Sequence, residues 1–186
     1  MNFLSSMDSD IRLEVVHVDS EGRNRGGAHK DVAHSMPGLL HLAFSIFLFD
    51  EHDRLVLQRR ASKKKLWPLF WSNSCCSHPF RDETGYSATK RRVKEELGSE
   101  AMYLKKIDRF EYKANFIDRG VEHELCEIWI GCMLSSEIRP NPDEVDSVAF
   151  LSCDQVSTAL RTTPELFTPW FTIEWPLLLS AKRLQK

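Results

Sequence analysis

The sequence predicts an α+β fold in which a mixed β-sheet is flanked by α-helices. Several short segments alternate apolar and polar residues, which is the period of a β-strand. One segment near the middle instead has a helical period and helix-capping residues at both ends. Strands that follow one another directly, with helices between the groups, favour α+β layers. With 186 residues, 42% of them hydrophobic, the chain can bury the core of one domain, which we expect over 1–186.

In the first half of the chain, the alternation over 11–19 predicts a strand, and Gly22, Gly26 and Gly27 predict turns after it. Two apolar runs, 42–49 and 55–57, flank a short polar turn and predict a β-hairpin.

The second half of the chain begins with a predicted helix over 84–97. Thr84 can cap its first turn, and Gly98 can end it. Its predicted apolar stripe consists of Tyr86, Val93 and Leu97. The same periodicities predict strands over 107–116, 125–134 and 147–152, and helices over 154–161 and 170–184.

Composition excludes several classes of protein. A formal net charge of -2 provides no global attraction for nucleic acid. No apolar run reaches the roughly 18 residues of a membrane span, and the N-terminus lacks the basic and apolar parts of a secretion signal. Five cysteines, an odd number, suit no disulfide framework. We therefore expect a reduced, cytoplasmic protein that acts on a small molecule, without nucleic-acid or membrane partners.

The predicted central helix carries a charged motif. Arg91 and Glu95, like Arg92 and Glu96, lie four residues apart and share a helix face. Alone, such pairs indicate only a solvated helix. The segment nevertheless resembles the Nudix box, G-x5-E-x7-R-E-U-x-E-E-x-G, which it matches at Glu83, Arg91, Val93, Glu95, Glu96 and Gly98.

The motif departs from the Nudix box at two positions. Ser77 replaces the first glycine, and Arg92 replaces a metal-binding glutamate. Exchanging a carboxylate for a guanidinium removes a metal ligand and adds a group that can hold phosphate. The change favours holding a diphosphate intact over hydrolysing it.

Further segments resemble the type 1 isopentenyl-diphosphate isomerases, which have the Nudix fold. The resemblance extends over 30–170, whereas 1–27 match only loosely. It rests on the segments 42–45 (LAFS), 59–64 (RRASKK), 73–79 (NSCCSHP), 110–114 (FEYKA), 122–124 (EHE) and 168–171 (TPWF), and on the spacing of His34 and His41.

The resemblance implies two metal sites and a diphosphate site. One divalent ion, Mn²⁺, Mg²⁺ or Zn²⁺, would bind His34, His41, His78, Glu122 and Glu124. Glu122 and Glu124 are two positions apart on an extended segment, so their side chains share one face. Two carboxylates on one face repel each other unless a cation or a proton compensates their charge. Imidazoles with carboxylates suit such an ion. A structural zinc site that uses Cys75 or Cys76 is the alternative. A substrate-bound Mg²⁺ would bind Glu96, and the diphosphate would contact Lys30, Arg60, Lys64 and Arg92.

The implied reaction converts isopentenyl diphosphate to dimethylallyl diphosphate in isoprenoid biosynthesis. An unactivated alkene must gain a proton at C4, pass through a tertiary cation and lose a proton from C2. The resemblance implies that Glu124, assisted by Tyr112, protonates C4. Cys76 removes the C2 proton as a thiolate, and we expect nearby Lys and His charges to lower its pKa. Trp170 faces the cation.

Three points stay open at the level of sequence. Trp67 is either a second aromatic wall for the cation or core packing. The alternative functions are a Nudix hydrolase of a nucleotide diphosphate and a metal-containing binding module without catalysis. We expect a monomer or a weak homodimer.

Overall fold

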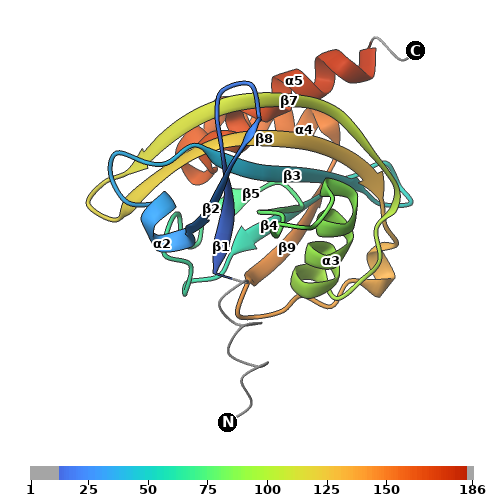
Figure 1. Ribbon diagram of the computed structural model, residues 1–186. Helices are drawn as coiled ribbons and strands as arrows, with labels where there is room; N and C mark the ends of the chain where they lie inside the picture. Colours follow the sequence, from blue (N-terminus) through green and yellow to red (C-terminus); the bar gives the residue numbers. More distant parts are fainter. Residues whose placement is uncertain (1–12, 184–186) are drawn as a thin grey trace.

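The computed structural model describes residues 13–183, and all strands within this range join one mixed sheet (Figure 1). The strands are β1 (Glu14–Val18), β2 (Asn24–His29), β3 (His41–Phe49), β4 (Leu55–Arg60), β5 (Trp71–Ser72), β6 (Cys75–Ser77), β7 (Met102–Phe116), β8 (Gly120–Cys132) and β9 (Val145–Leu151). The helices are α2 (Lys30–Ala33), α3 (Gly85–Leu97), α4 (Cys153–Thr162) and α5 (Pro169–Arg183), with 3₁₀ turns η1 (Ser135–Glu137) and η2 (Pro164–Leu166).

Strand β3 is the centre of the sheet. It runs parallel to β8, from the pair His41 and Glu124 to the pair Phe49 and Cys132. It is antiparallel to β1, β4 and β6. Strands β7 and β8 form a long antiparallel hairpin that arches over the sheet (Figure 1). The register of β3 with β6 and β8 places residues from three distant segments side by side.

Helices cover both faces of the sheet, so β3 is buried on both sides. Helices α4 and α5 lie on one side, and α3 lies on the other (Figure 1). Successive side chains of a strand point to opposite faces. Phe47 accordingly packs in the core with α5, whereas Phe44, Ile46 and Leu48 pack in the core with α3. This explains why 42–49 is a continuous apolar run.

The predicted central helix is confirmed, but its apolar stripe is partly wrong. Thr84 caps α3 by accepting a hydrogen bond from the Ser87 backbone N–H, and Gly98 ends the helix in the left-handed region at φ 67°. Val93 and Leu97 are fully buried, but Tyr86 is 52% exposed. Tyr86 lies in the first turn, where the helix starts at the edge of the core, and its ring centroid lies 6.3 Å from that of Trp129.

Two expectations about the first half of the chain are wrong. Gly26 and Gly27 lie inside β2 rather than in turns, since β2 pairs with β1 next to an irregular register at His17. A Cβ at Gly27 would lie 2.6 Å from the Glu14 carboxylate, so a larger residue there would require the Glu14 side chain to move. The expected hairpin is also incomplete: β3 and β4 pair only from Phe49 to Leu55, because β3 then pairs with β6 and β8, and β4 with β5 and β9.

The other predicted elements are present with shifted bounds. Strand β1 lies within 11–19, of which residues 11 and 12 are outside the described residues, as is residue 184 of the last helix. Strands β7, β8 and β9 and helices α4 and α5 correspond to the remaining predictions. The five cysteines are unpaired. No helix within 13–183 is long and apolar enough to cross a bilayer.

Candidate functional site

Five predicted metal ligands meet at one end of β3. His34 caps the end of α2, His41 begins β3, and His78 follows β6. Glu122 and Glu124 lie on β8 and, as expected, share a face. One ligand atom from each of the five lies within 4.8 Å of all the others. The parallel register of β3 and β8 brings this about, because it sets His41 beside Glu124.

The hydrogen bonds of the histidines leave lone pairs facing the centre of the cluster. The Nδ1 atoms of His34 and His41 each lie 2.7 Å from a backbone carbonyl, of Lys30 and Leu39, and so donate their protons outward. Their Nε2 atoms then face inward as acceptors, the arrangement usual for metal-bound imidazoles.

The buried carboxylates complete this donor set. Oε2 of Glu122 lies 2.8 Å from Nε2 of His34 but accepts no hydrogen bond, so a buried oxygen is left without a donor. A divalent cation would satisfy it together with the imidazoles. The residues therefore fit a divalent metal. The described part of the chain shows no cysteine in this group, which argues against the alternative zinc site.

The two carboxylates differ in their surroundings. Burial and the neighbouring carboxylate of Glu124 raise the pKa of Glu122. Burial also disfavours the charged form of Glu124, but the neighbouring His41 and His78 outweigh it and hold its pKa well below the usual value. Tyr112 donates a further hydrogen bond to Oε2 of Glu124, at 2.6 Å. These surroundings favour a Glu124 carboxylate that accepts a hydrogen bond from a protonated Tyr112.

Cys76 lines the same pocket, but its electrostatics differ from our expectation. Burial raises the pKa of Cys76 to about 12, although the Arg60 guanidinium, with Nη1 at 3.8 Å from Sγ, opposes the rise. The charge of Lys64 does lower the pKa of Cys76, as expected, but burial outweighs it and the net shift is upward. His78 does not help, because burial lowers its pKa well below the usual value and keeps it neutral. The resting form of Cys76 is the thiol.

The pocket has a volume of about 260 Å³ and an aromatic wall formed by Trp170. The indole Nε1 donates to Ser72 Oγ at 3.0 Å and to Asn73 Oδ1 at 3.2 Å, which fixes the ring. Trp67 contacts Trp170 edge-on, with ring centroids 5.3 Å apart, but does not line the pocket. Trp67 is core packing, whereas Trp170 presents its ring to whatever the pocket holds.

Basic side chains line another part of the pocket: Lys30, Arg60, Lys64 and Arg92. The Arg60 guanidinium donates to the carbonyls of Leu66 and Trp67 and is thereby held in place. Burial lowers the pKa of Lys30, as does the charge of Lys64. Four cations around one pocket favour the binding of an anion between them.

The predicted ligand of a second ion, Glu96, lies behind this basic cluster. It is 1% exposed, accepts a hydrogen bond from Gln58 and forms an ion pair with Arg92. Glu96 itself does not line the pocket, and Arg92 lies between Glu96 and the pocket. The helix is thus not simply solvated here, because its motif residues turn inward.

Comparisons with known proteins agree with this geometry. The model of the NUDIX domain matches residues 39–171. Proteins named isopentenyl-diphosphate Delta-isomerase are similar over most of the chain. The protein from Streptomyces avermitilis is 40% identical, over 87% of this chain and 80% of its own. The one from Haloarcula marismortui is 36% identical, over 88% and 90%. The chain belongs to the isopentenyl-diphosphate Delta-isomerase family.

Solved structures support the Nudix fold of this family member. A protein from Deinococcus radiodurans superimposes with a TM-score of 0.71 at 16% identity, covering 88% of this chain and 97% of its own. A MutT NUDIX hydrolase from Burkholderia pseudomallei gives 0.58 at 17% identity, covering 74% and 96%. The predicted fold class is confirmed.

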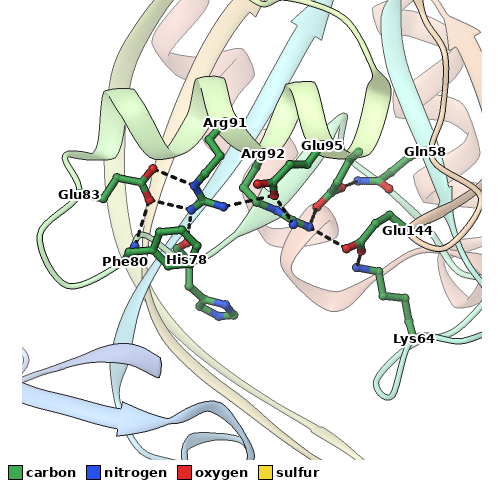
Figure 2. Close-up of polar contacts among 10 residues, drawn as sticks. Gln58, Lys64, His78, Phe80, Glu83, Arg91, Arg92, Glu95 and Glu144 are labelled. Atoms are coloured by element: carbon green, nitrogen blue, oxygen red, sulfur yellow. Dashed lines mark hydrogen bonds and ion pairs between the residues drawn. The ribbon is translucent and has the colours of Figure 1, made fainter. Parts of the chain in front are cut away.

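Two Nudix-box residues, Glu83 and Arg91, do not line the pocket but help to hold a candidate metal ligand, His78, in place. Arg91 forms an ion pair with Glu83, 2.7 Å from Nη2 to Oε2, and lies over the Phe80 ring at 3.8 Å (Figure 2). Its Nη2 also donates to the carbonyl of His78 at 3.4 Å. These contacts fix the loop between β6 and α3, and with it the His78 ring.

Sequence reasoning missed two carboxylates, one partly buried and one fully buried. Glu144 forms ion pairs with Lys64 and Arg92, but its segment, 140–144, looks like an ordinary polar turn. Glu174 is fully buried in α5, where it accepts from Cys126 Sγ at 3.5 Å. The signal for Glu174 was a glutamate inside an otherwise apolar helix segment. No sequence pattern indicated Glu144.

Proposed function

We propose that this protein isomerises isopentenyl diphosphate to dimethylallyl diphosphate, as the names of its relatives state for those proteins. One observation carries the proposal. A single pocket combines a thiol, Cys76, with the hydrogen-bonded pair of Tyr112 and Glu124, an indole wall, Trp170, and a cluster of cations. Two proton carriers, an aromatic surface and a diphosphate-binding region are the parts that a protonation and deprotonation of an alkene requires.

The diphosphate end of the substrate binds the cations Lys30, Arg60, Lys64 and Arg92. Arginine forks and lysine ammonium groups bind phosphate oxygens through charge-assisted hydrogen bonds. Glu96, which forms an ion pair with Arg92, would hold a Mg²⁺ that accompanies the diphosphate and would neutralise part of its charge. Such an ion normally binds one or two carboxylates and phosphate oxygens.

The hydrocarbon end then lies between the proton carriers. Glu124, through Tyr112, delivers a proton to C4, the tertiary cation faces Trp170, and Cys76 removes a proton from C2. The pair of Cys76 and Glu124 carries one proton before and after the reaction. Forward turnover starts with the proton on Glu124 and ends with it on Cys76. The raised pKa of Cys76 and the lowered pKa of Glu124 favour the thiol and the carboxylate, which are the forms from which the reverse reaction starts.

A divalent ion, Mn²⁺, Mg²⁺ or Zn²⁺, would be held by the cluster of His34, His41, His78, Glu122 and Glu124. Its charge would fix Glu124 and adjust the acidity of that carboxyl. The inward-facing imidazole Nε2 atoms and the unsatisfied oxygen of Glu122 support this assignment. We further propose that the protein acts in the cytoplasm as a monomer or weak homodimer.

Proton NMR in heavy water tests the function. The protein is loaded with each divalent ion in turn and incubated with isopentenyl diphosphate and Mg²⁺. We expect the exomethylene signals to disappear, two methyl signals to grow and deuterium to enter the product. Unchanged olefinic signals with every metal would refute the isomerase. Release of phosphate, measured by ³¹P NMR, would instead favour the alternative, a Nudix hydrolase.

A further inference from the structure

Glu144 connects two of the cations that line the pocket. Its Oε2 forms an ion pair with Nζ of Lys64, and its Oε1 lies 3.3 Å from Nη2 of Arg92 (Figure 2). Lys64 and Arg92 lie on a loop after β4 and on α3, 28 residues apart in sequence. Among the described residues, no other carboxylate forms ion pairs with two of the four cations, Lys30, Arg60, Lys64 and Arg92.

The backbone around Glu144 joins the same two elements. The carbonyl of Glu144 accepts from the Ala61 N–H at 3.0 Å, and the carbonyl of Ala61 accepts from the Lys64 N–H at 3.1 Å. On the other side, the Asn141 N–H donates to the carbonyl of Glu96, at 2.8 Å, near the end of α3. The segment from Asn141 to Glu144 is therefore anchored to the lysine loop and to the arginine helix.

Glu144 acts from behind the cations and not from within the pocket. Lys64 and Arg92 line the pocket, and Glu144 does not. Its side chain is 25% exposed, so solvent screens its ion pairs only in part. A flexible lysine that is already ordered loses less conformational freedom when it binds an anion. Without Glu144, Lys64 and Arg92 would also repel each other before substrate arrives.

We propose that Glu144 is a positioning residue for the diphosphate, which sets the separation of Lys64 and Arg92 so that both reach the same phosphate group. The inference rests on the proposed function for its substrate, but its chemistry concerns any diphosphate bound with Mg²⁺. It predicts an effect on diphosphate affinity and none on proton transfer, since Glu144 contacts neither Cys76 nor Glu124.

The variant Glu144→Gln tests the proposal, because it keeps the size of the side chain and the backbone contacts while removing the charge. Asp143→Asn is the matched control. Asp143 is the neighbouring residue and forms an ion pair with Lys63, but both side chains are exposed, at 68% and 72%. Calorimetry measures the binding of inorganic pyrophosphate with Mg²⁺, and steady-state kinetics with isopentenyl diphosphate separate KM from kcat.

For Glu144→Gln we expect pyrophosphate affinity to fall and KM to rise about tenfold, about 1.4 kcal/mol, with kcat within about twofold of the wild type. Glu144→Asp, which is too short to reach both cations, should show a smaller loss, and Asp143→Asn should behave as wild type. Unchanged or tighter pyrophosphate binding by Glu144→Gln would overturn the proposal. An equal loss in Asp143→Asn would also do so, because it would indicate a general charge effect.

Failure of this inference can be distinguished from failure of the proposed function. If the wild type binds pyrophosphate with Mg²⁺ but does not convert isopentenyl diphosphate, the isomerase proposal fails, and the binding data alone decide the role of Glu144. A wild type that binds no pyrophosphate overturns the role of Glu144 as well.

Discussion

Replacing Trp170 separates the contribution of its ring to catalysis from its contribution to stability. The residue is 3% exposed and donates one N–H to two buried acceptors, Ser72 and Asn73. Trp170→Ala removes a buried indole and should cost about 3–5 kcal/mol of unfolding free energy. Trp170→Phe keeps an aromatic face but leaves the acceptors without this donor, which should cost about 1–3 kcal/mol of unfolding free energy. Domains of this kind have about 5–15 kcal/mol of stability, so both variants can fold.

The catalytic effect should differ between the two variants. A desolvated cation gains about 2 kcal/mol from an aromatic face, which is roughly thirtyfold in rate. We expect Trp170→Phe to keep measurable activity, and Trp170→Ala to lose more than thirtyfold because water also enters the pocket. A substrate analogue with an ammonium group in place of the cationic carbon should bind the wild type much more tightly than isopentenyl diphosphate does. Trp170→Ala should lose this advantage.

The control is Trp175→Ala on the same helix. Trp175 is also 3% exposed and donates one hydrogen bond, to Ser157 at 3.0 Å, but does not line the pocket. The variant Trp175→Ala should therefore lose stability as Trp170→Ala does, but without the loss of activity. Rates are measured well below the midpoint of thermal unfolding, which circular dichroism determines for each variant. Equal activity losses in Trp170→Ala and Trp175→Ala, or equal analogue binding by wild type and Trp170→Ala, would refute the reasoning.

Three further predictions concern other buried groups. Cys76→Ala should reduce turnover at least about 10²–10⁴-fold. Cys75→Ala should have only a mild effect on turnover, because Cys75 packs in the core with α3. The opposite result would show that the two cysteines are misassigned. Glu122→Gln should lower the affinity for the divalent ion, measured by metal content after dialysis against a chelator; unchanged content would remove Glu122 from the site. Burial raises the pKa of Glu174 from 4.5 to about 8, so the folded state binds the extra proton and stability falls as pH rises between these values. Glu174→Gln should therefore gain stability relative to wild type over that range in urea titrations, and a constant difference would contradict the raised pKa.

Sequence determined the local features of this protein. Helix α3 is capped by Thr84 and by Gly98, as predicted, because capping depends on residues a few positions apart. That Glu122 and Glu124 share one face of β8 likewise follows from the strand period. The motif resemblance identified the family, which the comparisons confirm. It also named the pocket residues, whose roles in the reaction stay proposals.

Only the tertiary structure decided the features that depend on long-range pairing and on burial. Gly26 and Gly27 lie in a strand because β1 is available to pair with it, and no local signal shows this. The pKa of Cys76 rises because desolvation outweighs the charge of Arg60, and neighbours along the chain do not reveal how deeply a thiol is buried. Glu144 joins two cations only because 140–144 folds against both α3 and the loop after β4. Spacing along a chain determines which residues share a face, whereas strand register and solvent exclusion determine which groups meet and what charge they carry.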